Sequence, residues 1–329
     1  MDPEFAAAIA PLAKEKAPGV PTIAEARAHF DQTVTEVYKA HLQPSLPPES
    51  AYTVQDKTVD VDNGRISVRI LVPVVNDESA TFPVFVNIHG GGWSVGSIEL
   101  DDYFLRILCH KLRVSVVNIE YRLAPEHPFP TAVDDCFAAL KWTAANAPLL
   151  KADLKKGFIV GGHSAGGNLS AVLSHMARDD PFFHGRQLTG QLLREPMVVH
   201  PDAYPEDLRS ELRAMDENAD VPPLTADTIR HLYGWYNAPP SDPRLSPLLY
   251  PSHRGLPRAY IQAMSLDPLR DDALVYERAL RDAGVETRLA LYPGVSHGFH
   301  YNLPAISLAR KTLPVWTLVQ VLSAGAVLL

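Results

Sequence analysis

A serine lies between small residues in the pentapeptide Gly162-His163-Ser164-Ala165-Gly166. A chain of 329 residues contains a G-x-S-x-G pattern by chance roughly one time in ten, so the pattern needs support from its surroundings. Residues 158–160 favour a buried strand directly before it, and residues 165–177 favour a helix directly after it. A sharp strand-to-helix turn of this kind exposes the serine hydroxyl. Ser164 is therefore the candidate nucleophile.

A run of glycines follows another predicted strand. His89-Gly90-Gly91-Gly92-Trp93 comes directly after the apolar run 84–88. Glycines allow backbone N–H groups to approach closely, and such groups can stabilise the oxyanion that forms when an acyl carbon is attacked. A phosphate-binding loop would need G-x-x-x-x-G-K-[ST] or G-x-G-x-x-G, and neither follows here. The loop indicates acyl transfer, and Trp93 is a candidate substrate contact or, equally, a core residue.

A serine hydroxyl is a weak nucleophile, so it needs a histidine to accept its proton and an acid to orient that histidine. His297 directly follows the last predicted strand, in a turn that also contains Pro293 and Gly294. This position makes His297 the best candidate base, with His300 and His200 as the alternatives.

The candidate acid is Asp267, which follows the predicted strand 259–264. Asp271 and Asp272 are close rivals. They fall at the start of a predicted helix, where acidic side chains commonly do no more than complement the helix dipole. Asp267 is therefore preferred.

The chain order Ser164, Asp267, His297 is that of an α/β hydrolase and not that of chymotrypsin-like or subtilisin-like proteases. The predicted elements agree with this fold. Asp62-Asn63-Gly64 lies between alternating apolar residues and predicts an antiparallel hairpin over 53–73. Beyond it, strands alternate with helices, which predicts a mostly parallel, eight-stranded sheet covered by helices on both faces. The strands are expected at 84–88, 114–119, 158–160, 192–199, 259–264 and 289–292, and the helices at 132–145, 165–177 and 273–283.

Two segments do not fit this alternation. One is a helical N-terminal arm, residues 1–50, and the other is the Pro-rich and acidic stretch 201–251 around a predicted helix at 226–236. We expect both to form a helical cap over a catalytic domain of residues 51–200 and 252–329. The uncharged run 312–329 is barely long enough to span a membrane and is interrupted by Pro314 and Gln320, so we expect a final helix on the core instead of stable membrane insertion.

Composition limits the classes of partner. A net charge of -8 without any Lys/Arg-rich stripe argues against nucleic-acid binding. Cys109 and Cys136 are expected to be buried thiols, because they are too few for a disulfide framework and are not spaced like metal ligands. No metal or organic cofactor is required. No secretion signal is visible, so a cytoplasmic location is expected, although residues 1–5 resemble a vector-derived sequence that could have replaced a leader. A homo-oligomer remains open.

Five ordered motifs resemble those of the hormone-sensitive-lipase-like esterases, also called bacterial family IV, over roughly residues 50 to 323. They are His89-Gly90-Gly91-Gly92-Trp93, Tyr121-Arg122-Leu123-Ala124-Pro125-Glu126, Gly162-His163-Ser164-Ala165-Gly166-Gly167-Asn168, Asp267-Pro268-Leu269-Arg270-Asp271 and His297-Gly298-Phe299. The resemblance implies a triad, a cap, and a structural role for residues 121–126 beside the serine turn. The implied triad is Ser164, Asp267 and His297, and the implied oxyanion donors are the backbone N–H groups of Gly91, Gly92 and Ala165.

The chain departs from the family at His163, where Asp or Thr is usual, and around residues 205–223. Together the motifs predict a serine carboxylester hydrolase (EC 3.1.1) that acts on short to medium acyl esters through an acyl-enzyme on Ser164. The same residues could attack an amide, a carbamate or a lactone. A non-catalytic small-molecule binder similar to plant gibberellin receptors is a further alternative, but those receptors lack the histidine that His297 would supply.

Overall fold

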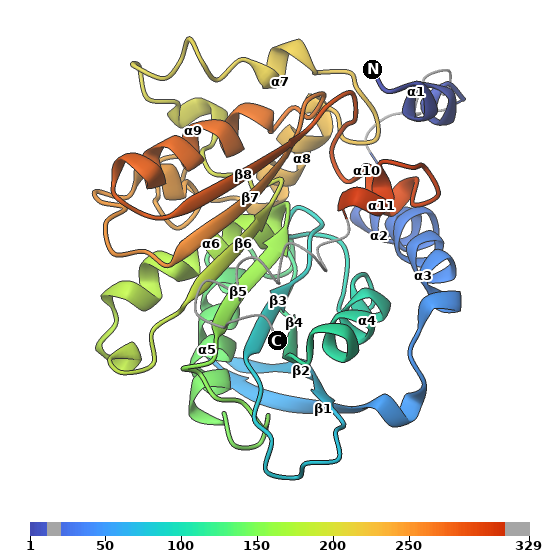
Figure 1. Ribbon diagram of the computed structural model, residues 1–329. Helices are drawn as coiled ribbons and strands as arrows, with labels where there is room; N and C mark the ends of the chain where they lie inside the picture. The colour runs from blue at the N-terminus through green and yellow to red at the C-terminus, as the bar shows by residue number, and fades with distance from the viewer. Residues whose placement is uncertain (12–20, 313–329) are drawn as a thin grey trace.

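An eight-stranded sheet forms the centre of the computed structural model, which describes residues 1–11 and 21–312 (Figure 1). The strand order is β1-β2-β4-β3-β5-β6-β7-β8. Both partners of β2 run antiparallel to it, and all other neighbours are parallel. The predicted mostly parallel sheet is therefore confirmed. The strands are β1 (Tyr52–Val61), β2 (Gly64–Pro73), β3 (Val84–Ile88), β4 (Ser115–Glu120), β5 (Phe158–His163), β6 (Gly190–Arg194), β7 (Arg258–Met264) and β8 (Thr287–Tyr292).

The predicted hairpin is present as β1 and β2, with Val61 opposite Gly64 in the register. The two residues between the strands form the turn, and Asn63 takes a positive φ of 54°. Asn tolerates this left-handed conformation better than most residues, so the turn residues set the register of the hairpin.

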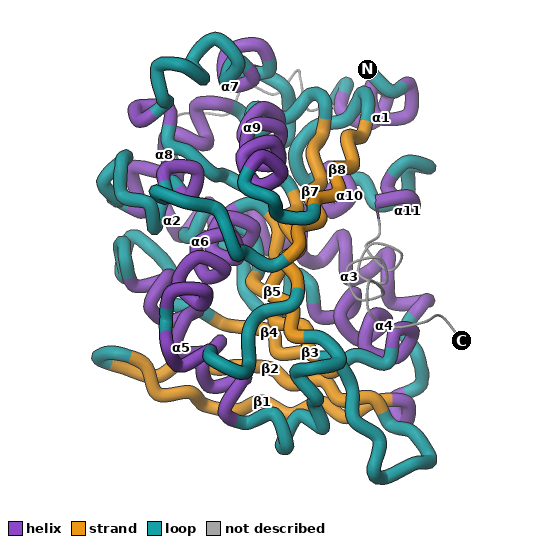
Figure 2. The backbone as a smooth tube through the Cα atoms, turned by 60° about the vertical axis from the view of Figure 1, so that its left-hand side comes forward, coloured by secondary structure: helices purple, strands orange, loops and turns teal. Residues whose placement is uncertain are grey.

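Alternate residues of the central strands supply two different cores. In β3, Val84, Val86 and Ile88 pack on the side of α5 (Thr131–Ala145) and α6 (Ala165–Asp179). Phe85 points the other way and packs with α4 (Asp102–Leu112). Figure 2 shows helices on both sides of the sheet, as predicted. Because strand side chains alternate between faces, a continuous apolar run is what a strand covered on both sides requires.

The remaining helices lie at the N-terminus, between β6 and β7, and after β7. They are α1 (Pro3–Ile9), α2 (Ile23–Phe30), α3 (Glu36–Leu42), α7 (Ala214–Glu217), α8 (Ala226–Tyr236), α9 (Arg270–Asp282), α10 (Phe299–Asn302) and α11 (Ala309–Thr312). The prediction for β6 was too long. The strand ends at Arg194 because Glu195 takes a φ of 50° and Pro196 cannot donate a ladder hydrogen bond, so residues 195–199 leave the sheet.

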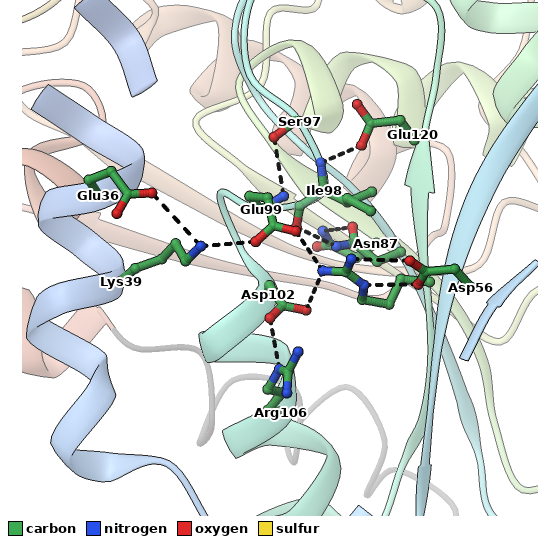
Figure 3. Close-up of polar contacts among 12 residues, drawn as sticks. Glu36, Lys39, Asp56, Asn87, Ser97, Ile98, Glu99, Asp102, Arg106 and Glu120 are labelled. Atoms are coloured by element: carbon green, nitrogen blue, oxygen red, sulfur yellow. Dashed lines mark hydrogen bonds and ion pairs between the residues drawn. The ribbon is translucent and has the colours of Figure 1, made fainter. Parts of the chain in front are cut away.

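Charged side chains fasten α3 to the sheet. Lys39 lies 2.9 Å from one carboxylate oxygen of Glu99, and the other oxygen lies 2.7 Å from Arg69 on β2. Arg69 also pairs with Asp56 and with Asp102, at the start of α4 (Figure 3). Asp102 is buried, so the network continues from the exposed arm into the interior.

A second anchor holds α2 beside the glycine loop. Arg27 pairs through both terminal nitrogens with the carboxylate of Glu126, and its Nε donates to the carbonyl of Ser94 at 2.9 Å. Nη2 also donates to the carbonyl of Ala124. A bidentate guanidinium contact fixes orientation as well as distance. Arg27 thus attaches the N-terminal arm to Ser94, after the glycine loop, and to the segment 124–126.

The segment between β6 and β7 carries α7 and α8, which lie at the end of the sheet where the parallel strands terminate (Figure 1). The division into a catalytic domain and a cap built from residues 1–50 and 201–251 stays a prediction. The final helix expected over 312–329 lies outside the described residues, apart from Thr312 at the end of α11. Within residues 1–11 and 21–312, the structure contains no helix with the length and apolar character needed to cross a bilayer.

Candidate active site

Ser164 occupies a tight turn between β5 and α6. Its φ of 56° and ψ of -120° lie in a region that L residues rarely adopt. A Cβ atom placed on Gly162 or Gly166 would lie 2.3 Å or 2.0 Å from the carbonyl oxygen of Ile88, so neither position accepts a larger residue. The Ser164 N–H donates to the carbonyl of Arg194 on the neighbouring strand at 2.8 Å. The predicted strand-turn-helix around Ser164 is therefore present, held by β3 on one side and β6 on the other.

The glycine loop lies against this turn. A Cβ atom on Gly90 would come within 2.9 Å of the carbonyl oxygen of His163. Gly91 and Gly92 have φ values of 116° and 56°, and the backbone at Gly91 passes so close to Val95 that a Cβ atom would lie 2.1 Å from its carbonyl oxygen. The loop can take this path only without side chains. The structure thus brings the predicted donor loop beside the turn of Ser164 and Ala165.

His297 and Asp267 are in direct contact. Nδ1 of His297 lies 2.7 Å from Oδ2 of Asp267, and Oδ1 of Asp267 accepts the N–H of Leu269 at 2.8 Å. Both side chains are buried. Burial lowers the pKa of His297, but the negative charges of Asp267 and Glu195 outweigh it and raise the pKa above its usual value. The pair is suited to a histidine that must carry a positive charge transiently.

The serine turn and the histidine turn are neighbours. His163 directly precedes Ser164, and its ring centroid lies 4.9 Å from that of His297. Burial and the nearby charge of His297 hold the pKa of His163 well below its usual range, so the His163 ring is neutral near pH 7. The residue that departs from the family pattern therefore packs against the candidate base.

The rival acids have other partners. Asp271 accepts the N–H groups of Arg213 and Ala214, at 2.8 and 2.7 Å. Asp272 accepts the N–H groups that follow β6, at Val198 and Val199. Burial raises the pKa of Asp272 to about 8. Both carboxyl groups therefore tie α9 to the segment between β6 and β7, and Asp267 is the one in contact with His297.

The rival histidines also lie elsewhere. His200 packs on Tyr233 of α8 with ring centroids 4.2 Å apart, and its Nδ1 accepts the N–H of Asp202. His300 is fully enclosed in α10, where burial holds its pKa well below the usual range. Neither has the contact with Asp267 that His297 makes.

Trp93 is completely buried and stacks on Tyr236 of α8, with ring centroids 4.3 Å apart and planes within 4°. This is the core role that the sequence left open beside substrate contact. The same helix places Leu232 over the glycine loop, because a Cβ atom on Gly92 would lie 2.4 Å from Cδ1 of Leu232. Helix α8 therefore packs against the loop that carries the candidate oxyanion donors Gly91 and Gly92.

Residues 121–126 pack against the start of the glycine loop, in the structural role that the resemblance implied. Tyr121 stacks on His89 at 4.3 Å, and its hydroxyl donates to the His89 carbonyl. Arg122 forms a bidentate pair with buried Asp135 on α5. Both contacts fix the start of the glycine loop relative to the sheet.

One buried side chain at the site had no sequence motif. Glu195, directly after β6, places an oxygen 3.3 Å from Nδ1 of His297 and 3.3 Å from Nε2 of His163. The ligand atoms of these three residues lie within 4.8 Å of one another, but we do not assign them as metal ligands. Hydrogen bonds already engage two of the atoms, because His297 contacts Asp267 and the Gly298 N–H donates to Glu195. The available sequence signal was the charged Arg194-Glu195 pair, which interrupts the apolar run predicted as a strand over 192–199.

Comparison with known proteins gives the family. A family model described as alpha/beta hydrolase fold matches residues 85–301. Carboxylesterase NlhH of Mycobacterium tuberculosis is 38% identical over 275 residues, which are 80% of this chain and 82% of the relative. The crystal structure of vibralactone cyclase has a TM-score of 0.95 and 41% identity, over 98% of this chain and 95% of that chain. An esterase of Pyrobaculum calidifontis has a TM-score of 0.82 and 30% identity, over 98% of both chains.

These relatives share more than the fold, since two of the three are esterases and the identity extends over most of the chain. The motif order found in the sequence and the sheet topology agree with them. The chain belongs to the hormone-sensitive-lipase-like esterases of the α/β-hydrolase fold and is a carboxylesterase-type hydrolase.

Proposed function

We propose that this hydrolase cleaves short to medium acyl esters of small molecules through a covalent acyl-enzyme on Ser164. Oγ of Ser164 attacks the ester carbonyl carbon while Nε2 of His297 takes its proton. Asp267 accepts the Nδ1–H bond and stabilises the imidazolium. The backbone N–H groups of Gly91, Gly92 and Ala165 stabilise the oxyanion.

Collapse of this first tetrahedral intermediate completes the acylation of Ser164. His297 gives its proton to the leaving alkoxide, and the alcohol departs. Water then attacks the acyl group on Ser164 and passes a proton to His297. Collapse of this second intermediate releases the acid and returns the proton to Oγ. The chain's own residues are sufficient for every proton transfer in this scheme.

The observation that carries the proposal is the buried contact of 2.7 Å between His297 and Asp267, next to the strained turn of Ser164. Hydrolysis of p-nitrophenyl butyrate by the parent protein and by Ser164→Ala tests it. Loss of turnover in the variant supports a Ser164 acyl-enzyme. Full turnover without the hydroxyl would contradict it.

The acyl preference depends on Leu232, which lies over Gly92. We expect the parent kcat/KM to be highest for acetate to hexanoate esters and to fall for longer chains. Leu232→Ala removes volume above the glycine loop, so the ratio of kcat/KM for decanoate to that for butyrate should rise about tenfold, in line with what added methylenes contribute in a pocket. The measurement is a p-nitrophenyl ester series.

The matched control for Leu232→Ala is Leu149→Ala, because Leu149 is 47% exposed in a loop after α5. That variant should leave the ratio unchanged. A parent maximum at decanoate or longer esters, or the same ratio in Leu232→Ala as in the parent, would contradict the short-chain proposal.

A second candidate function is lactone formation, favoured by the TM-score of 0.95 and 41% identity to vibralactone cyclase. The acyl-enzyme would be the same, but a hydroxyl on the acyl chain would attack the carbonyl in place of water. His297 would take the hydroxyl proton and return it to Ser164. The products distinguish the two candidates, since an ester of a hydroxy acid yields free hydroxy acid by hydrolysis and lactone by cyclisation.

A further inference from the structure

Glu195 is a buried carboxylate that the triad does not use. Its side chain is 0% exposed. It follows β6 at the point where the Arg194 carbonyl accepts the Ser164 N–H, and its own N–H donates to Gln262 on β7. The end of β6 therefore lies between the turn of the candidate nucleophile and the strand that leads to Asp267.

One oxygen of Glu195 faces the histidine turn. Oε2 accepts the N–H of Gly298 and lies 3.3 Å from Nδ1 of His297. Gly298 has a φ of 60°, so the backbone directly after His297 turns sharply at the residue that Glu195 holds. The same oxygen lies 3.3 Å from Nε2 of His163. A single carboxylate thus touches both the candidate base and the residue before the candidate nucleophile.

The adjacent residue holds the same turn at a second point. Nη2 of Arg194 lies 2.9 Å from the hydroxyl of Tyr301, which donates to Asp101 at 2.8 Å. Arg194, Asp101 and Tyr301 are all buried. Two consecutive residues at the end of β6 therefore fix the start and the end of the segment from His297 to Tyr301.

The protonation states of the groups around Glu195 favour a positive charge on His297. Burial holds the pKa values of His163 and His300 well below the usual range, so both rings are neutral near pH 7. Arg194, through Nη2, contacts Tyr301 and Asp101, and its permanent positive charge also interacts with Glu195. His297 is the group facing Glu195 that gains a positive charge during the proposed reaction. Oε2 of Glu195 lies 3.3 Å from Nδ1 of His297, and this carboxylate favours the charged form of the imidazole.

We propose that Glu195 is a positioning residue for His297, which fixes the turn through Gly298 and, together with Asp267, stabilises the imidazolium. The inference rests on the proposed role of His297 as the base. In this arrangement two carboxylates face Nδ1 of one histidine, with Asp267 as the close hydrogen-bond acceptor and Glu195 as the electrostatic partner.

The test is Glu195→Gln, which keeps an oxygen that can accept the Gly298 N–H but removes the charge. The acidic limb of kcat/KM reports the pKa of the free base. Glu195 raises that pKa, so its neutralisation should move the limb to lower pH by about one unit. We also expect kcat to fall about tenfold. Glu277→Gln is the matched control, because Glu277 is a buried carboxylate on α9 that pairs with Arg281 and Thr287, and it should leave both values unchanged.

Asp267 and Glu195 raise the pKa of His297, and the neutral rings of His163 and His300 and the guanidinium of Arg194 are the other titratable or charged groups around Glu195. A readout independent of activity separates this proposal from the proposed mechanism. Titration of the His297 C2 proton by NMR in the Ser164→Ala protein, with and without Glu195→Gln, should show the same downward shift even if Ser164 were not the nucleophile.

An unchanged or raised pKa of His297 in Glu195→Gln would overturn the proposal, even with reduced kcat, because loss of a purely structural contact has no reason to lower that pKa. Glu195→Asp is the second variant. It retains the charge but draws it back by one methylene, so the pKa of His297 should fall by less than in Glu195→Gln. If Glu195→Gln does not fold, a Glu195→Asp protein with the parent pKa of His297 would overturn the proposal.

Discussion

Replacement of Ser164 by alanine is expected to lower kcat for p-nitrophenyl butyrate by about 10⁴-fold or more while the protein still folds. The magnitude follows from serine hydrolases in which the nucleophile acts as one unit with its base, so that loss of the hydroxyl removes the covalent route entirely. Alanine keeps the β-carbon and fits the turn between β5 and α6, where the backbone already takes a φ of 56°. The residual rate should resemble that left by binding and the oxyanion donors alone.

Ser174, on the helix that follows Ser164, provides the control. The hydroxyl of Ser174 donates to the carbonyl of Ser170 in α6, and the side chain is buried. Ser174→Ala removes one buried hydroxyl without touching the turn of Ser164. Its kcat should stay within about twofold of the parent, since the net contribution of such a hydrogen bond is about 1 kcal/mol of stability. Equal losses in Ser174→Ala and Ser164→Ala would indicate a folding defect instead of a lost nucleophile.

Replacement of Asp267 by asparagine is expected to lower kcat by about 10³- to 10⁴-fold. The amide can still accept the Leu269 N–H, so the turn should persist. At the other position, an NH₂ group would face Nδ1 of His297 and favour the wrong tautomer, and the imidazolium would lose its closest counter-charge. Glu195 remains 3.3 Å from Nδ1, which places the expected loss toward the lower end of this range.

The matched control for Asp267→Asn is Asp272→Asn. Burial raises the pKa of Asp272 to about 8, so asparagine replaces a carboxyl group that is mostly uncharged at pH 7. Activity should change little, and the main measurable effect should be on thermal unfolding through the contacts to Val198 and Val199. A larger loss of kcat in Asp272→Asn than in Asp267→Asn would show that Asp267 is not the acid of the triad.

Local sequence signals were strong wherever a backbone conformation restricts residue type. Three such places are the hairpin turn at Asn63, the small residues around Ser164 and the glycines after His89. Each has a backbone conformation that few residue types accept, so each could be predicted from the sequence alone. Their positions after predicted strands then selected Asp267 and His297, the chain order agreed with an α/β hydrolase, and the structure places these two residues in contact. Burial on both faces made the parallel strands readable as apolar runs.

Local sequence patterns gave wrong or missing predictions where tertiary contacts determine the length of an element or the role of a residue. The apolar run 192–199 predicted a long strand, but the positive φ at Glu195 ends β6 at Arg194, and the residues beyond it serve as hydrogen-bond partners of Asp272. Helix α4 was not predicted, although its buried face packs under Phe85. Glu195 carries no motif, because its role comes from residues about 100 positions away that only the folded chain brings together.

The packing of the segment between β6 and β7 was the least predictable part of the fold. Leu232 and Tyr236 have helical spacing on α8, which the sequence showed, but their contacts with Gly92 and Trp93 depend on how the segment between β6 and β7 folds back over the sheet. Packing partners of this kind have no fixed residue type. The reacting residues could therefore be proposed from sequence, but the contact of Leu232 with the glycine loop could be found only in the structure.

The most direct test of the acyl-enzyme is rapid acid quench with p-nitrophenyl acetate followed by intact-protein and peptide mass spectrometry. The nitrophenolate leaves readily, so acylation should outpace deacylation and the covalent species should accumulate. The account predicts one acetyl group per chain, located on the peptide that contains Ser164, with a matching burst of nitrophenol and no adduct in Ser164→Ala. Catalytic release of nitrophenol with the acetyl group on another residue, or an equal adduct in Ser164→Ala, would contradict it.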